Sequence, residues 1–355
     1  MDTKRELRSS VSGIPRVMDL PQPYLLFLGD TMEKGYAKTA FGLRDWAKDR
    51  CVGEWSCDGA TVSTSLPRLT PKEARARGAR ALVIGVANIG GVISDSWLPS
   101  LIDALESGLD IISGMHAKLG DVLQLKSTAE RHGRRLIDVR TPPQNISTAS
   151  GVKRSGKRLL TVGTDCAIGK KYTALALARA FTQRGLDADF RATGQTGIMI
   201  SGGGIPMDAV IADFAAGAAE MLSPAAPEQH WDVIEGQGSL FHPAYAGVSL
   251  ALLHGSQPDV IVVCHQPGRD RVLGHAGYFL PGIDETIELN LRLGRRTNVA
   301  IRCSGVSLDT SRLDAPVAHR LLAEESARLG LPVADPIRGG AQFRALVDAC
   351  LTDSD

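Results

Sequence analysis

Residues 159–178 read LLTVGTDCAIGKKYTALALA, and this stretch decides the fold of the second half of the chain. An apolar run, a glycine-rich turn and a segment with alanine and leucine at helical spacing predict a strand, a tight loop and a helix. Glycine lets the loop curl so that successive backbone N–H groups point at one anion, and the helix N-terminus adds its dipole. The stretch therefore predicts a P-loop that binds a phosphate-bearing small molecule.

Two features distinguish this loop from the common G-x-x-x-x-G-K-[ST] pattern. Five residues separate Gly163 from Gly169, which resembles the loop of dethiobiotin synthetase-like P-loop proteins. Lys171 stands where serine or threonine normally holds Mg²⁺. Because two lysines can neutralise a diphosphate without a metal, we expect no metal and no ordinary ATP hydrolysis. The residues expected to bind the phosphates are Gly163, Thr164, Asp165, Cys166, Ala167, Ile168, Gly169, Lys170 and Lys171.

The rest of the chain alternates apolar runs with longer amphipathic stretches, which indicates parallel strands joined by helices. We expect further strands at residues 24–29, 81–86, 110–113, 136–139, 187–192, 232–235, 259–264, 299–303 and 332–334. We expect helices at residues 71–78, 97–107, 127–132, 170–183, 210–220, 311–329 and 341–351.

One segment interrupts this alternation. Residues 140–158, RTPPQNISTASGVKRSGKR, are rich in Pro, Ser, Gly and basic side chains and lack apolar periodicity. Such a segment is typical of a connection between domains. We predict an α/β protein with a Rossmann-like parallel-sheet domain over residues 1–150 and a P-loop NTPase-like parallel-sheet domain over residues 151–355.

Composition excludes several classes of function. Lys plus Arg number 40 and Asp plus Glu 39, so a net charge of +1 provides no field for nucleic acid or an anionic membrane. Residues 1–12 are charged and lack the apolar segment of a signal peptide, and no apolar run is long enough to span a membrane. The six cysteines show no C-x-x-C spacing, which favours reduced thiols in a cytoplasmic protein.

Candidate bases follow predicted strands. Residues 232–243 read DVIEGQGSLFHP, which places Glu235 at the end of a strand and His242 in the loop after it. Glu235 becomes a base where burial raises its pKa, whereas His242 needs no such shift. His116 follows another strand and is a weaker candidate from the first domain. Each histidine has a structural alternative, and Asp208, Asp213 and His265 are the next candidates.

Candidate substrate contacts lie in two loops of the second domain and one of the first. Gln195 and Thr196, in the segment ATGQTG, carry hydrogen-bonding groups beside flexible glycines. Arg269 and Arg271 have the fork that suits a carboxylate or a phosphate, and Lys118 can reach the site across the domain cleft. Simple solvation of these charges in surface loops is the alternative.

Taken together, four motifs resemble one known family. They are GTDCAIGKK at 163–171, ATGQTG at 192–197, EGQGSLFHP at 235–243 and SGMH at 113–116, and the resemblance spans residues 25–351. The family contains the DgcN-type D-glutamate N-acetyltransferases. It implies an N-terminal Rossmann-like domain, a C-terminal P-loop domain, and transfer of an acetyl group from acetyl-CoA to the amine of D-glutamate. A second enzyme would then act on the N-acetyl product, and we expect a homo-oligomer.

The residues themselves leave two other functions open. An ATP-dependent kinase or ligase of the dethiobiotin synthetase-like class is built on the same loop. A nucleotide-binding regulatory protein without catalysis would also need it. ATP turnover with Mg²⁺ favours the first, and tight nucleotide binding without turnover of any amine favours the second.

Overall fold

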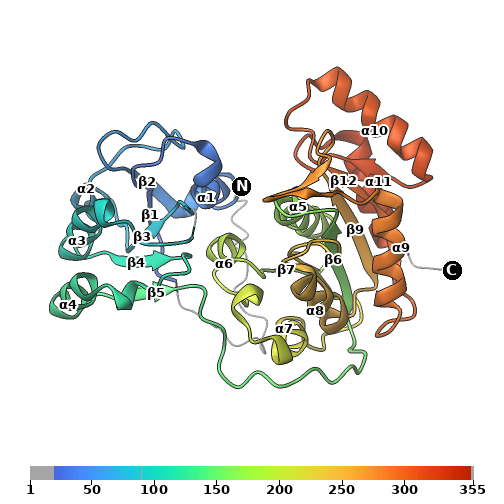
Figure 1. Cartoon of the computed structure of the whole chain (residues 1–355), viewed down its shortest axis with the longest axis horizontal. Coiled ribbons are helices and arrows are strands. Elements are labelled where there is room, and N and C mark those ends of the chain that lie inside the picture. The colour runs from blue at the N-terminus through green and yellow to red at the C-terminus, as the bar shows by residue number, and fades with distance from the viewer. Residues whose placement is uncertain (1–19, 89, 353–355) are drawn as a thin grey trace.

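The computed structural model describes residues 20–88 and 90–352, and its framework is two separate β-sheets of parallel strands (Figure 1). The first sheet contains β1 (Tyr24–Phe27), β2 (Cys51–Trp55), β3 (Ala81–Ile84), β4 (Asp110–Ser113) and β5 (Leu136–Asp138). Its strand order is β2-β1-β3-β4-β5, with β1 between β2 and β3. This order is one of the common doubly wound arrangements, in which ligands bind beyond the carboxyl ends of the strands.

Four α-helices accompany the first sheet. They are α1 (Lys38–Trp46), α2 (Pro71–Ala76), α3 (Leu98–Glu106) and α4 (Leu123–His132). The sequence did not predict α1 or β2. Strand β2 contains Gly53 and the buried carboxylate Glu54, which no apolar pattern reveals. Glu54 is satisfied by tertiary hydrogen bonds from Ser63 and Thr64, so the strand tolerates a buried charge.

The second sheet carries the P-loop. Its strands are β6 (Lys157–Gly163), β7 (Ala188–Arg191), β8 (Trp231–Ile234), β9 (Val260–His265), β12 (Arg302–Leu308) and β13 (Val333–Ala334), and β10 (Arg271–Val272) and β11 (His275–Phe279) form a separate hairpin. The order is β13-β12-β9-β6-β8-β7. Strand β6 therefore lies between β8 and β9, and the loops after all three strands meet at one sheet edge.

Helices cover both faces of this second sheet (Figure 1). Leu159 of β6 packs with α5 (Lys170–Gln183) and α11 (Gly340–Leu351), whereas the next residue, Leu160, packs with α7 (Ala215–Leu222) and α8 (Ala246–Ser256) on the other face. The remaining helices are α6 (Gln195–Ser201), α9 (Ile283–Gly294) and α10 (Ala315–Leu329). The predicted fold class, a Rossmann-like sheet followed by a P-loop sheet, is confirmed.

Several predicted elements have different bounds, and three of these differences have a clear physical reason. The strand expected at residues 299–303 begins only at Arg302, because Val299 is 84% exposed in a turn that precedes β12. The helix expected at residues 210–220 is a short 3-10 turn at Ala212–Phe214 that leads into α7. The helix expected from residue 311 begins after Asp314, whose side chain caps the helix through the N–H of Val317.

The segment between the sheets is well anchored. The guanidinium of Arg158, which is 1% exposed, donates to the Ser223 hydroxyl and to five backbone carbonyls, among them those of Ser155 and Pro224. The Glu220 carboxylate accepts from the N–H of Ser150. The boundary placed within residues 140–158 stays a prediction.

Two sequence expectations concern membranes and export. None of the helices in the described part of the chain has the length and apolar character needed to cross a membrane. The expectation that residues 1–12 form no signal peptide lies outside the described residues.

The two domains touch through α1 and α6, which lie side by side between the sheets in Figure 1. Ile198, Met199 and Ile200 of α6 belong to the same buried cluster as the strands of the first sheet. The hydroxyls of Thr39 and Thr196 also share a hydrogen bond of 2.9 Å across this contact. The P-loop domain thus packs the short helix α6 into the core of the first domain. This contact sets how the two domains are placed on either side of the site.

Candidate active site

The P-loop has the geometry that its sequence predicts. Strand β6 ends at Gly163, and α5 begins at Lys170. Gly169 has φ +100°, a conformation that favours glycine and turns the chain directly into the helix. The Lys170 ammonium is buried and donates to the carbonyl of Asp165, and burial lowers the pKa of this lysine. The loop and the helix N-terminus therefore form one cationic cradle.

Arg269 holds this loop in shape. Its guanidinium lies 3.0 Å from Asp165 Oδ2 and donates to the carbonyls of Cys166 and Ala167. The Asp165 carboxylate also accepts the N–H of Leu273 at 2.9 Å. The sequence predicted Arg269 as a substrate contact. In the structure its guanidinium binds the loop itself, which explains how an irregular turn of backbone stays ordered.

A cavity of about 750 Å³ opens beside the loop, and both domains line it. This volume lies within the range of small-molecule sites. Of the predicted contacts, it is lined by Cys166, Ala167, Ile168, Gly169, Lys170, Lys171, Gln195, Thr196 and Glu235. Gly163, Thr164 and Asp165 lie deeper, with Thr164 and Asp165 buried behind the exposed part of the loop. The structure therefore brings most of the predicted contacts together in one place.

Glu235 is the buried carboxylate of this cavity. It follows β8 and is 4% exposed. Its Oε2 accepts the backbone N–H groups of Thr193 (3.0 Å) and Gly194 (3.1 Å). Gly236 allows the strand end to pack closely, since a Cβ there would lie 1.6 Å from the Thr161 carbonyl. Burial raises the pKa of Glu235, while the Lys171 ammonium and these N–H groups oppose the rise.

Lys171 points away from the phosphate cradle toward the first domain. Its Nζ lies 5.3 Å from the centre of the Tyr172 ring and would lie 3.3 Å from a Cβ on Gly42 of α1. Burial lowers the pKa of Lys171 to about 8, and the negative charge of Glu235 opposes this change. The second lysine of the motif is therefore placed between the P-loop and the neighbouring domain.

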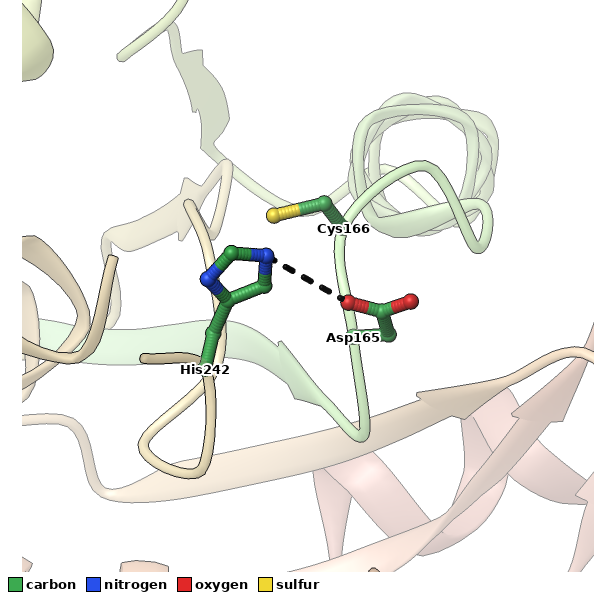
Figure 2. Close-up of side chains that lie close together, drawn as sticks. All are labelled: Asp165, Cys166 and His242. Atoms are coloured by element: carbon green, nitrogen blue, oxygen red, sulfur yellow. Dashed lines mark ion pairs between the residues drawn. The ribbon is translucent and has the colours of Figure 1, made fainter. Parts of the chain in front are cut away.

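His242 lies close to Asp165 and Cys166 of the P-loop (Figure 2). It is 2% exposed and is absent from the cavity lining. Its Nδ1 accepts the N–H of Ala244 at 3.1 Å, so the neutral ring carries its proton on Nε2. That nitrogen lies 3.9 Å from Asp165 Oδ1, and neither atom has a hydrogen-bond partner among the described residues. Burial lowers the pKa of His242, which favours the neutral ring.

These three side chains have the composition of a metal site. Their ligand atoms lie within 4.8 Å of one another. Metal-bound histidine normally donates its second ring N–H to an acceptor. Here the second nitrogen of His242 faces the Ala244 N–H, which is itself a donor. The ring is therefore set to donate from Nε2 toward Asp165 rather than to bind a cation there.

Three predicted contacts lie apart from the cavity. His116 and Lys118 are exposed in the loop after β4, and the charge of Arg140 lowers the pKa of His116. Arg271 lies in the hairpin, where it donates to the carbonyl of Ala276 and stacks on Phe279 at 3.4 Å. None of the three lines the cavity. Their roles as base or substrate contacts stay predictions, and this placement weighs against them.

The sequence missed the charged residues that the first domain contributes, which are Lys34, Lys38 and Arg140. Arg140 donates to the Gly114 carbonyl and to Gln195 Oε1 and pairs with Asp208, so it joins the two domains at the cavity edge. No motif surrounds these residues. The available signal was the position of Lys34 and Lys38 after the first predicted strand, at the sheet edge where ligands bind.

Known proteins resemble the chain over both domains. Residues 49–142 match the DUF1611 Rossmann-like domain and residues 146–346 match the DUF1611 P-loop domain, each described as a domain of unknown function. A crystal structure of a DUF1611 family protein from Anabaena variabilis superimposes with a TM-score of 0.82 at 33% identity, covering 94% of this chain and 99% of that one.

Two D-glutamate N-acetyltransferases are also similar over nearly their whole length. The protein from a Pseudoalteromonas species is 49% identical over 323 residues, which are 91% of this chain and 97% of the relative. The protein from Tritonibacter scottomollicae is 50% identical over 327 residues, which are 92% and 98%. The chain therefore belongs to the DUF1611 family, together with these two D-glutamate N-acetyltransferases, and is an acyltransferase.

Proposed function

We propose that the protein transfers the acetyl group of acetyl-CoA to the amine of D-glutamate. The two relatives that are named for this reaction support the acceptor. One observation carries the chemistry: a cationic P-loop and the buried carboxylate of Glu235 line the same cavity. The loop suits the diphosphate of coenzyme A, and the carboxylate suits an ammonium.

The P-loop holds the donor in this proposal. The backbone N–H groups at the start of α5 and the Lys170 ammonium bind the diphosphate. Cys166 lines the cavity, but burial raises the pKa of its thiol, with Lys170 opposing. A neutral thiol is a poor nucleophile, so the acceptor amine attacks the thioester directly.

Glu235 is the base in this proposal. Its carboxylate takes one proton from the ammonium of D-glutamate, and the free nitrogen attacks the thioester carbonyl. A C–N bond forms and the C–S bond breaks. The departing thiolate of coenzyme A takes the second proton from the nitrogen, and Glu235 releases the first proton to solvent. The N–H groups of Thr193 and Gly194 fix the carboxylate, so it faces the acceptor without rearrangement.

A donor and acceptor panel tests the proposed function. The purified protein is incubated with acetyl-CoA, acetyl phosphate or ATP and with D-glutamate, L-glutamate, D-glutamine or D-aspartate. Release of free thiol and the mass of the product are followed. We expect release of thiol and formation of N-acetyl-D-glutamate only when acetyl-CoA and D-glutamate are both present. ADP formation from ATP and Mg²⁺ would instead establish the kinase or ligase alternative, and binding of nucleotide without any product would favour the regulatory one.

We further expect that the transfer proceeds without a divalent metal. Lys171 occupies the position of the metal-binding hydroxyl, and the His242 ring is set to donate from Nε2. The rate in EDTA should therefore equal the rate in buffer alone. Loss of activity in EDTA that Mg²⁺ or Zn²⁺ restores would contradict this expectation. Assembly as a homo-oligomer and a cytoplasmic location stay predictions.

A further inference from the structure

The walls of the cavity carry different charges. The charged residues that the first domain contributes are all cations: Lys34 in the 3-10 turn Lys34–Tyr36, Lys38 at the first position of α1, and Arg140 after β5. The charged residues that the facing domain contributes are mixed in sign: Glu235, Asp208, Asp309, Asp335, Arg338 and the two lysines of the P-loop. An anion held between the domains therefore meets only cationic charged groups on the wall that the first domain provides.

The arginines do not supply free charge to this space. Arg338, which lines the cavity, donates to Thr310 and lies 3.7 Å from Asp335. Arg269, beside the P-loop, is bonded to Asp165, Cys166 and Ala167. Arg140 is paired with Asp208 and bonded to Gln195. Their guanidinium groups are thus neutralised or used to hold the walls in place.

Lys34 and Lys38 are different, because both are exposed and, within the described part of the chain, neither ammonium has a hydrogen-bond or ion-pair partner. Lys38 also faces the other domain, since it lines the same cavity as Cys166 and Lys171. It begins α1, so the positive end of that helix dipole adds to its charge. Two unpaired cations that the same domain contributes to a cavity can bind two anionic groups.

We propose that Lys34 and Lys38 form the subsite for the two carboxylates of a dicarboxylic amino acid. The first domain then selects the acceptor, and the P-loop domain holds the donor and the base. This inference rests on the proposed function, because it orients an acceptor whose ammonium is directed at Glu235. A monocarboxylic amino acid leaves one of the two lysines without a partner, so the second carboxylate is required for tight binding.

Steady-state kinetics of Lys34→Met and Lys38→Met test the subsite. Methionine keeps the length of the stem and removes the charge. Each substitution should raise KM for D-glutamate roughly 10- to 100-fold and change KM for acetyl-CoA less than about threefold, as expected for loss of one charge-assisted contact. The matched control is Lys48→Met, an exposed lysine of the same domain that does not line the cavity. Circular dichroism confirms the fold of each variant.

Calorimetric binding of glutarate separates the subsite from the reaction. Glutarate has both carboxylates but no amine, so its binding needs no acetyl transfer. Binding by the unaltered protein and by Lys48→Met, with loss in Lys38→Met, supports the subsite even where D-glutamate proves not to be acetylated. Unchanged KM for D-glutamate in both cavity variants overturns the subsite and leaves the proposed function standing. A rise in KM for acetyl-CoA instead would show that these lysines hold the donor.

Discussion

The loops after β1 and β6 leave the carboxyl ends of equivalent inner strands, but they offer anions different surfaces. After β6, a glycine turn leads straight into α5, and Lys170 folds back over the loop. After β1, the carboxylate of Asp30 accepts from the Trp97 indole at 2.8 Å, and the chain then makes a 3-10 turn before α1 begins. The first arrangement is a nest of backbone N–H groups, whereas the second displays two exposed lysines, one in the 3-10 turn and one at the start of α1.

The difference shows how one topology serves two ligands. A diphosphate has many acceptor oxygens on one compact group, so a nest of N–H groups matches it well. Two separate carboxylates require donors that reach different points, which long lysine stems provide. Both loops lie at the edge of a parallel sheet, where strand ends converge on a common space. We therefore expect substitutions in the two loops to affect different substrates.

The largest effect should come from a residue outside both loops. If the loops only bind and Glu235 is the base, Glu235→Gln should lower kcat about 10²- to 10⁴-fold with little change in either KM. The burial of the carboxylate predicts that the acidic limb of the wild-type pH–rate profile lies above the ordinary range of a glutamate. The control is Glu228→Gln, an exposed carboxylate away from the cavity. A near wild-type kcat with an unmoved acidic limb would exclude Glu235 and return attention to His242.

Lys170→Ala should give the next largest effect, and this substitution should weaken the binding of the donor without affecting the acceptor. Loss of its charge-assisted contacts should weaken acetyl-CoA binding by ~1.5–3 kcal/mol, or about 10- to 150-fold. KM for D-glutamate should stay within about threefold, which is the reverse of the pattern expected for Lys38→Met. Calorimetry with coenzyme A measures the change directly. Unchanged affinity in a folded variant would mean that the loop after β6 does not hold the diphosphate.

The smallest effect should appear at the opposite edge of the second sheet, where charges serve the fold. His230, just before β8, contacts Asp187 at 2.9 Å and Asp232 at 3.1 Å, and these hydrogen bonds raise its pKa, chiefly through Asp232. A raised pKa stabilises the folded state fully below the unfolded value of about 6.5, and this contribution is lost as pH rises through the folded value. His230→Gln should therefore lower the free energy of unfolding by ~1–2 kcal/mol at pH 6 and by less at pH 9.

Urea unfolding at the two pH values measures this change. Kinetic constants for both substrates should not move, since His230 lies away from the cavity. An equal loss of stability at both pH values would mean that packing rather than charge explains the role of this histidine.

The local sequence pattern was sufficient to predict features that are formed by a few consecutive residues. The P-loop, the strand that ends before Glu235 and the division into two α/β sheets follow from apolar periodicity and glycine placement. The residues around Gln195 were also predicted at the site, because loops after parallel strands share one edge. Helix α1 and strand β2 were missed, because Gly42, Gly53 and Glu54 interrupt the apolar periodicity of these elements. Tertiary contacts accommodate the three residues in the folded protein.

By itself, the sequence determined the P-loop, the α/β class and the membership of the family, because each depends on short-range spacing that the backbone obeys locally. Only the tertiary structure decided which charges face the ligand. It bonded Arg269 to the loop, buried His242 close to it, and brought Lys34 and Lys38 to the cavity through the contact of α1 with α6. A charged side chain in a loop has no periodicity, and its role depends on the partners that distant segments bring to it.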